Sequence, residues 1–270
     1  MSNPHARLHR RVLISLVCFA LIAGAGPAGA TVIKAGIDVF KNSAPSIGFD
    51  GLPLNVANPT FQPAPGLPGG TSVMFGGYFV GQSRGTVASC GALGCLDGQP
   101  SGTLTLDAGA EPTFVTLDTS APDDHVLSGS PRFTGPISIL FGTDQAAVGV
   151  MAGFATDSGA ERLTAFGRDG SILASIVNDA LGYSFLALAS DDGSAAIAGV
   201  QITRTGATPG GFAVSDLRFG GPDQIEISGG GSGNGEPSTP VPAPGNLALF
   251  ALALGLITIA CRRRARGQRG

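Results

Sequence analysis

The chain has 270 residues, of which 16 are Lys or Arg, 19 are Asp or Glu and 43 are Gly, and it contains no Trp. A formal net charge of −3 excludes the strongly basic surface typical of nucleic-acid-binding proteins. Glycine does not recur at every third position and apolar residues do not recur in heptads, so collagen and coiled coil are excluded as well.

The first 30 residues have the organisation of a secretory signal peptide. Three arginines precede an apolar stretch over 12–23, and Ala28 and Ala30 supply the small residues of a cleavage site. We therefore expect an apolar signal helix in 1–30, cleavage after Ala30, and export of everything that follows.

The part of the chain between the two ends is distinctly acidic. Residues 31–243 hold eight of the basic residues and all nineteen acidic ones, which gives this span a net charge of −11. Such a surface repels nucleic acid and can attract divalent cations. The span keeps a single histidine, His125, so a hydrolytic triad has one candidate base; the simpler interpretation of His125 is an exposed loop residue.

Segment 31–70 is rich in proline, which is excluded from central strands because it cannot donate to the hydrogen-bond ladder. We expect an irregular wrap over the rest of the domain. The prolines are Pro53, Pro59, Pro63, Pro65 and Pro68.

Cys90 and Cys95 bracket a short Gly-rich turn. In an oxidising compartment such a pair is expected to form a disulfide, which would stabilise the fold by about 2 kcal/mol. A metal site is the alternative, but it would need two further soft ligands, and the sequence offers none nearby.

Short apolar or alternating runs, separated by clusters of Gly, Asp, Ser and Pro, dominate 70–220, and this pattern is typical of an all-β sandwich or barrel. About two hundred residues suffice for one domain, 31–227, with a substantial core. The expected strands cover residues 72–80, 102–106, 114–117, 137–141, 146–154, 162–168, 171–177, 183–189, 196–204 and 212–219.

Residues 163–174 predict a hairpin, because Asp169 and Gly170 lie between two runs that favour β structure and both tolerate positive φ. From Ile137 onward, the order of the GPISILFG strand, the LTAFGRDGSIL hairpin and the YSFLALAS strand resembles lectin-like jelly-roll domains. That resemblance covers roughly residues 70–220. It implies a single jelly-roll-like β-sandwich, a fold in which some members bind carbohydrate, often with structural calcium.

Four aspartates are candidate calcium ligands, because calcium prefers six to eight hard oxygens. Asp157, Asp191 and Asp192 follow expected strands, and Asp216 lies in the last one. The simpler interpretation is that Asp-Ser-Gly and Asp-Asp-Gly are turn sequences, since Asp hydrogen-bonds to its own backbone and Gly accepts positive φ.

Residues 228–240 form a Gly-, Ser- and Pro-rich sequence typical of a flexible linker. The apolar segment 245–261 follows without a charge and, at seventeen residues, is just long enough for a transmembrane helix. Cationic residues after such a segment stay on the cytoplasmic side and stop transfer. They are Arg262, Arg263, Arg264 and Arg266.

Residues 241–270 resemble the PEP-CTERM protein-sorting signal, which combines a short Pro-rich motif, one hydrophobic helix and a terminal arginine cluster. The motif here is Val241, Pro242, Ala243 and Pro244, with Ala243 where the family usually has Glu. The resemblance implies recognition by an exosortase, a membrane enzyme thought to cut near the motif, and delivery toward the outer surface of a bacterium that makes exopolysaccharide.

These observations favour a non-catalytic protein of the cell surface or extracellular matrix, anchored in the inner membrane before processing. Calcium-assisted carbohydrate binding is the first alternative. A polysaccharide-active hydrolase, the second alternative, would need two carboxylates about 5 to 9 Å apart, and no spacing in the sequence identifies such a pair. Phosphate-binding loops, dinucleotide fingerprints and zinc motifs are not found in the sequence context they require, so we expect no cofactor apart from a possible calcium ion.

Overall fold

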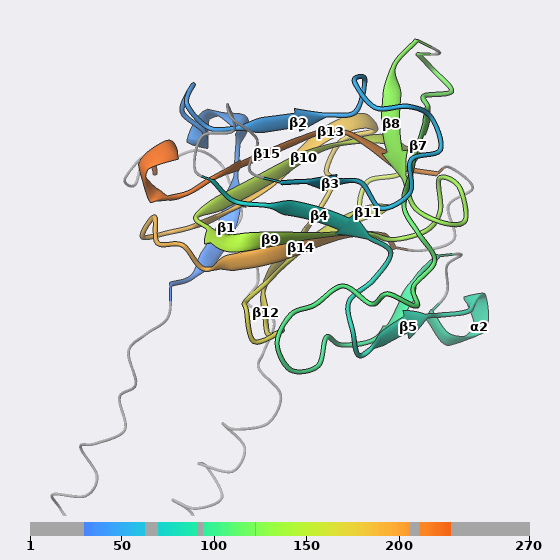
Figure 1. Ribbon diagram of the computed structural model, residues 1–270, viewed down its shortest axis with the longest axis horizontal. Coiled ribbons are helices and arrows are strands. Elements are labelled where there is room, and N and C mark those ends of the chain that lie inside the picture. Colours follow the sequence, from blue (N-terminus) through green and yellow to red (C-terminus); the bar gives the residue numbers. More distant parts are fainter. Residues whose placement is uncertain (1–29, 63–69, 91–93, 122, 206–210, 228–270) are drawn as a thin grey trace, which may run out of the picture.

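The computed structural model of the chain describes residues 30–62, 70–90, 94–121, 123–205 and 211–227. These residues form an all-β structure of antiparallel sheets with almost no helix (Figure 1). Its helical elements are the four-residue α2, Val87–Cys90, and two single turns, η1, Ile37–Val39, and η2, Pro222–Gln224.

Two large sheets contain most of the strands in the described residues. The seven-stranded sheet has the order β1-β13-β10-β15-β8-β7, with β2 also pairing with β15. Its strands are β1 Val32–Ala35, β2 Ser46–Gly48, β7 Phe114–Leu117, β8 His125–Ser128, β10 Ala147–Ala155, β13 Gly182–Ser190 and β15 Ala213–Gly220.

The six-stranded sheet has the order β12-β11-β14-β9-β4-β3. Its strands are β3 Thr60–Phe61, β4 Val73–Gly76, β9 Ile137–Gln145, β11 Glu161–Phe166, β12 Ile172–Val177 and β14 Ile197–Arg204. A separate small hairpin joins β5, Gln82–Arg84, to β6, Leu96–Gly98.

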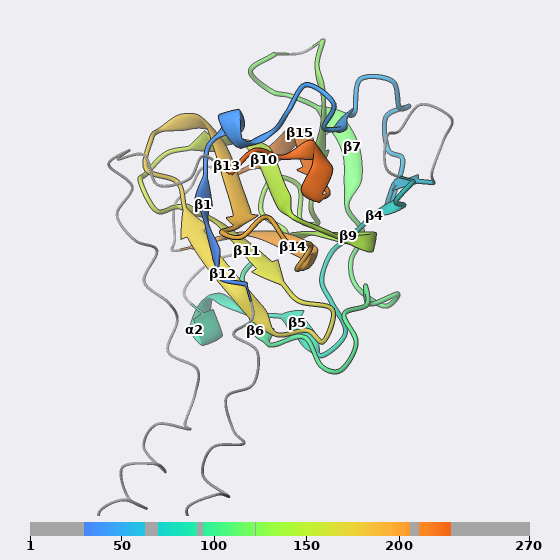
Figure 2. The ribbon, with the colours of Figure 1, turned by 90° about the vertical axis from the view of Figure 1, so that its left-hand side faces the viewer.

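The main apolar core lies between the two large sheets. Alternate residues of each strand point to one face, so a strand with every second residue apolar can bury that face. Val148 and Val150 of β10 pack in one cluster with Ile139 and Phe141 of β9 and with Leu163 of β11. In Figure 2, β1 and β12, which are edge strands of different sheets, lie next to each other on the left of the molecule.

The outer faces of the sheets are also partly covered. Val39, Phe40 and Ile225 pack on alanines of β10 and β13, outside the seven-stranded sheet. The segment that follows β4 places Phe79 and Leu104 against the outer face of the six-stranded sheet. Central strands are therefore buried on both sides, which explains why β10 and β13 are apolar almost throughout.

Eight of the ten expected strands coincide with observed strands of similar extent. The expected strand 72–80 is observed only as Val73–Gly76, after which the chain leaves the sheet. Residues 102–106 are irregular apart from one bridge between Phe79 and Leu106. Leu104 turns toward Phe79 and Phe166 in the outer cluster, so its apolar character reflects this contact and not a strand.

Segment 31–70 was expected to be an irregular wrap, and in this respect the expectation needs correction. The segment contains the short strands β1, β2 and β3. Within the described part of the chain, each pairs with one strand and lies at a sheet margin. Prolines in the flanking sequence are tolerated there because one side of the strand needs no donors.

The predicted hairpin of β11 and β12 forms, with a different turn from the expected one. Gly170 has φ of +82°, whereas Asp169 is not left-handed. The amide N–H of Gly170 donates to the carbonyl of Gly167 and that of Gly167 to the carbonyl of Ser171. This is a type I turn followed by a left-handed glycine, which requires only one residue with positive φ.

We expect Leu163→Ala to lower the free energy of unfolding by about 2–5 kcal/mol, because Leu163 is fully buried between the sheets and truncation leaves a cavity. Leu181→Ala is the control, since Leu181 is 66% exposed. Chemical denaturation of both variants measures the difference. Equal losses in the two variants would contradict the assignment of the core.

Candidate functional site

The four candidate calcium ligands do not form a cluster in the described residues. Asp157 follows β10, whose Ala155 pairs with Gly182 at the start of β13, whereas Asp191 follows the end of β13. At about 3.3 Å per residue, the nine-residue β13 separates these two positions by roughly 26 Å. No group of three His, Cys, Asp or Glu side chains suited to a metal ion occurs within the described part of the chain.

The acidic turns are instead held by hydrogen bonds within and around them. Asp192 Oδ1 accepts from Ser190 Oγ, 2.9 Å, and from the amide of Ser194, 2.8 Å. Asp191 Oδ1 accepts from the amide of Thr31, 3.1 Å. These contacts give the aspartates of this turn a structural role, as expected for Asp next to Gly.

Of the two cysteines, only Cys95 has a described side chain. It is 6% exposed, and its Sγ lies 3.6 Å from the carbonyl oxygen of Thr86. Cys90 ends α2, and its side chain lies outside the description. The disulfide between them stays a prediction.

His125 begins β8 and is half-buried, so the interpretation as an exposed loop residue was wrong. Its amide donates to Asp50 Oδ1 at 2.8 Å, and its Nδ1 lies 2.8 Å from the carbonyl oxygen of Leu52. A carbonyl only accepts, so Nδ1 carries the proton. The histidine thereby fastens the 50–52 segment to the seven-stranded sheet.

The best candidate site lies at one end of the molecule and was not found from the sequence. Tyr183, at the start of β13, donates its hydroxyl to Asp118 Oδ2 at 2.8 Å. Ser120 donates both its amide, 2.7 Å, and its hydroxyl, 2.9 Å, to Asp118 Oδ1. Tyr183 thus joins Asp118 and Ser120, more than sixty positions earlier in the chain, in one polar group, and the tyrosine as a whole is 50% exposed.

The charge state of this group follows from its hydrogen bonds. Burial opposes ionisation of Asp118, but the bonds from Ser120 and Tyr183 outweigh it and hold the pKa of Asp118 below its ordinary value. Burial, followed by the adjacent carboxylate, raises the pKa of Tyr183. At neutral pH the site therefore presents a carboxylate and a neutral phenol.

The Tyr183 ring lies against the backbone of β10. A Cβ on Gly153 would come within 2.7 Å of Tyr183 Cε1, so the ring occupies space that only glycine leaves open. The ring of Phe154 lies 5.4 Å from it, centroid to centroid. Next to Phe154 is a shallow, mainly apolar depression of about 200 Å³, lined by Thr119, Phe133, Phe154, Thr156 and Gly211.

Two of the lining residues have left-handed backbone conformations, which are uncommon for bulky side chains. Phe133 has φ of +62° and Phe154 of +79°. Phe154 lies in the bulge where the pairing of β10 with β13 shifts register. Such strain, of about 1–3 kcal/mol per residue, tends to occur at functional positions. Together with Tyr183 and Asp118, these rings could receive a ligand that has both apolar C–H faces and hydroxyl groups.

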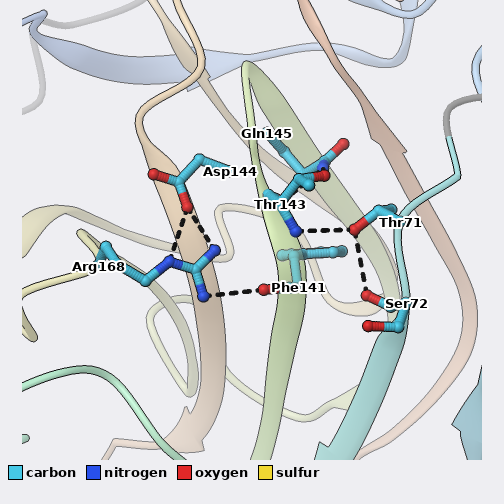
Figure 3. Close-up of polar contacts among 7 residues, drawn as sticks. All are labelled: Thr71, Ser72, Phe141, Thr143, Asp144, Gln145 and Arg168. Carbon is cyan, nitrogen blue, oxygen red and sulfur yellow. Dashed lines mark hydrogen bonds and ion pairs between the residues drawn. The ribbon is translucent and has the colours of Figure 1, made fainter.

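A second polar cluster joins the tip of the β11–β12 hairpin to the end of β9 (Figure 3). Arg168 donates Nε and a terminal nitrogen to Asp144 Oδ1, and its other terminal nitrogen to the carbonyl of Phe141 at 2.9 Å. In the same view, the amide of Thr143 donates to Thr71 Oγ1 at 3.0 Å. The cluster lies where the pairing of β9 with β14 shifts register between Leu140 and Gln145, and we assign it a structural role.

Glu161, the first residue of β11, is the most unusual ionisable group. It lies on the same side of the strand as Leu163, facing the core, and is directly paired with Arg204 of β14. Neither of its carboxylate oxygens has a hydrogen-bond partner within the described residues. Burial raises the pKa of Glu161 from 4.5 to about 7, and the charge of Arg204 opposes this effect only in part.

Of the expected signal cleavage site, Ala28 lies outside the described residues and Ala30 is the first described residue. The sorting motif and the terminal arginines lie outside the described residues. Within the described ranges, no helix has the length and apolar character needed to span a membrane. Neither a scan against protein-family models nor a search of curated proteins finds a match for this chain.

We predict that Glu161 makes the protein less stable as pH rises from 4.5 to 7. Below pH 4.5 its carboxyl is protonated in both states; between the two values the unfolded chain releases the proton first, which favours unfolding. The gap between the two pKa values corresponds to about 3 kcal/mol. Glu161→Gln should remove this part of the dependence.

The measurement is the free energy of unfolding in denaturant at several pH values from 4 to about 8. Glu226→Gln, at an exposed position, is the control and should follow the native protein. If the free energy of unfolding of Glu161→Gln depended on pH as that of the native protein does, ionisation of the buried Glu161 would not be the cause.

Proposed function

We propose that this chain is an exported protein with a single jelly-roll-like β-sandwich, displayed at the cell surface or in the extracellular matrix without a catalytic role. The observation that carries the proposal is the sequence of its last thirty residues: a Pro-rich motif, an uncharged apolar segment at 245–261 and an arginine cluster. Such a tail retains its cations in the cytoplasm and leaves the preceding residues on the other side.

The N-terminal sequence supports the same direction of transport. Its basic start, apolar stretch and small-residue cleavage site direct the chain to a secretion pathway. Exported residues 31–243 are acidic, which favours solubility in a hydrated matrix. The proposed partners are the membrane, an exosortase-like enzyme that acts on the tail, and extracellular polysaccharide.

The arrangement of the described ends is compatible with display on a tether. Thr31 exchanges hydrogen bonds with Asp191, in the turn after β13, and Ile227 packs near Gly193 in the same turn. The chain therefore enters and leaves the described structure at one end of β13. Tyr183 and Asp118 lie at the other end, so a C-terminal anchor would leave this candidate site on the side remote from the membrane.

The jelly-roll-like assignment rests on the sheet order. Strands distant in sequence are neighbours in both sheets, as in β1-β13-β10-β15 and in β14-β9-β4, and all pairings are antiparallel. Two such sheets packed on a common core are what Greek-key and jelly-roll connections produce. We extend this to the fold type and draw no function from it alone.

Processing can be tested by the intact mass of the protein recovered from the envelope and from the medium. We expect the N-terminus to begin at Thr31 and the released form to end near Pro244. Replacing Arg262, Arg263, Arg264 and Arg266 by Ser should prevent retention and cleavage, because the stop-transfer charge is lost. Full-length protein in the cytosol would refute the proposal.

Saccharide binding at the Tyr183 site is a second candidate function. Sugars have C–H faces that stack on aromatic rings and hydroxyl groups that bind carboxylates, and this site offers both. It uses the half-exposed Tyr183 and the ionised Asp118.

We expect Tyr183→Ala to weaken binding of the full chain to cell-free exopolysaccharide at least tenfold, which corresponds to about 1.4 kcal/mol. Ile37→Ala is the control, because Ile37 is 52% exposed, close to the 50% of Tyr183, but lies in η1. Binding is measured by affinity electrophoresis with and without calcium. Equal affinity of the two variants, or no binding by the native chain, would remove this candidate.

A further inference from the structure

The free edges of the two sheets are protected to different degrees. An exposed edge strand presents unpaired N–H and C=O groups and can pair with another chain, so proteins usually block it with charges, prolines or covering segments. On β7, the 55–58 segment covers the edge. The amide of Asn55 donates to the carbonyl of Val115 at 2.8 Å, and the amide of Val115 donates to the carbonyl of Val56 at 3.0 Å.

Two further edges carry other forms of protection. The edge strand β1 contains Lys34, which is on the core-facing side next to Leu188 and forms an ion pair with Asp179 at 2.9 Å. An inward-pointing lysine on an edge disfavours a further strand. The edge strand β3 has only two residues and directly follows Pro59.

Within the strand itself, the edge β12 has little such protection, although the Lys34–Asp179 ion pair lies just beyond its end. Its sequence, Ile-Leu-Ala-Ser-Ile-Val, has no charge and no proline. Among the described residues β11 is its only pairing partner. Ile172 and Val177 are 36% and 40% exposed. One bulge at Leu173 interrupts the pairing with β11, close to the hairpin turn, and leaves 174–177 regular.

We infer that β12 is a self-association edge, at which two copies of this chain pair antiparallel to form one continuous sheet. A two-fold axis through Ser175 would place Ser175 opposite its counterpart and Leu173 opposite Val177 of the second copy. Residues opposite each other in an antiparallel pair share a face, so apolar side chains meet apolar ones. The pairing is independent of export and of the Tyr183 site.

Charge limits where two copies of this chain can meet. Residues 31–243 carry a net charge of −11, so two copies repel each other over most of their surface. The uncharged β12 lets them approach without pairing like charges within the strand. A six-residue contact buries less than the roughly 1,200 Å² of a stable interface, so the association is weak in dilute solution and grows with local concentration.

The test is sedimentation velocity of the full chain in non-ionic detergent, from about 10 µM to about 500 µM, a range that covers weak association. We expect a concentration-dependent dimer for the native chain and for Val80→Lys, and at least tenfold weaker association for Val177→Lys. Val80 is the matched control, because it is the same residue type and is 41% exposed, against 40% for Val177. Monomers throughout, or equal association of all three, would overturn the inference.

A cross-linking variant keeps the inference testable if Val177→Lys does not fold. Under mild oxidation, Ser175→Cys should form a covalent dimer that a reductant separates, because the two positions face each other across the axis. The native chain, which has four other cysteines, gives the background. If Ser175→Cys gave no more covalent dimer than the native chain, the inferred pairing of two copies would be overturned. Finding another partner, or another segment of this chain, on β12 would not rescue it.

Discussion

Burial of the apolar inner faces of two sheets against each other is the constraint on which the rest of the structure depends. Val148 and Val150 of one sheet and Ile139 and Phe141 of the other are fully buried in the same cluster. Neither sheet could expose such a face to water, at roughly 25 cal/mol for each Å² of apolar surface. The edge strands take part in this burial as well, since Val32 of β1 and Ile176 of β12 belong to the same cluster.

The outer faces modify this arrangement. Phe79 and Leu104 cover part of the six-stranded sheet, and buried polar groups accompany them. Gln201 donates to Ser138 Oγ at 2.7 Å and to Gln82 Oε1 at 2.9 Å, and Ser138 in turn donates to the carbonyl of Gly77 at 3.0 Å. These bonds satisfy polar groups that the covering segment removes from water, so the segment has a defined position.

The sequence was sufficient to predict the all-β class and the long strands, because period-two patterns and turn residues are local signals. The 114–117 strand and the β11–β12 hairpin illustrate this. The short edge strands β1 and β2 escaped prediction because three or four residues carry too little pattern, and their pairing with β13 and β15 depends on contacts more than 150 positions away.

The candidate site could not have been predicted in the same way. Tyr183 belongs to β13 and Asp118 to the loop after β7, and these strands lie far apart in the sheet order. The sequence signal of acidic residues pointed to Asp157, Asp191 and Asp192, which follow strands because turns need them there. In contrast, Asp118 owes its position to the hydrogen bonds it accepts, which composition and spacing do not reveal.

The strained residues lie at the end of the molecule that holds the candidate site. Four non-glycine residues have positive φ; Asn55 and Asn58 belong to a residue type that tolerates it, whereas Phe133 and Phe154 do not. Phe133 is held by its amide bond to Ser128 Oγ, 2.7 Å, and by the amide of Phe212 donating to its carbonyl, 2.7 Å.

Such strain persists only where surrounding contacts over-determine the backbone. Phe133 and Phe154 lie beside a half-exposed tyrosine and an ionised aspartate, and it is here that we propose recognition. At the opposite end, near Thr31 and Ile227, no described residue other than glycine has positive φ. The distribution of strain therefore favours recognition at the end of the molecule remote from the proposed anchor.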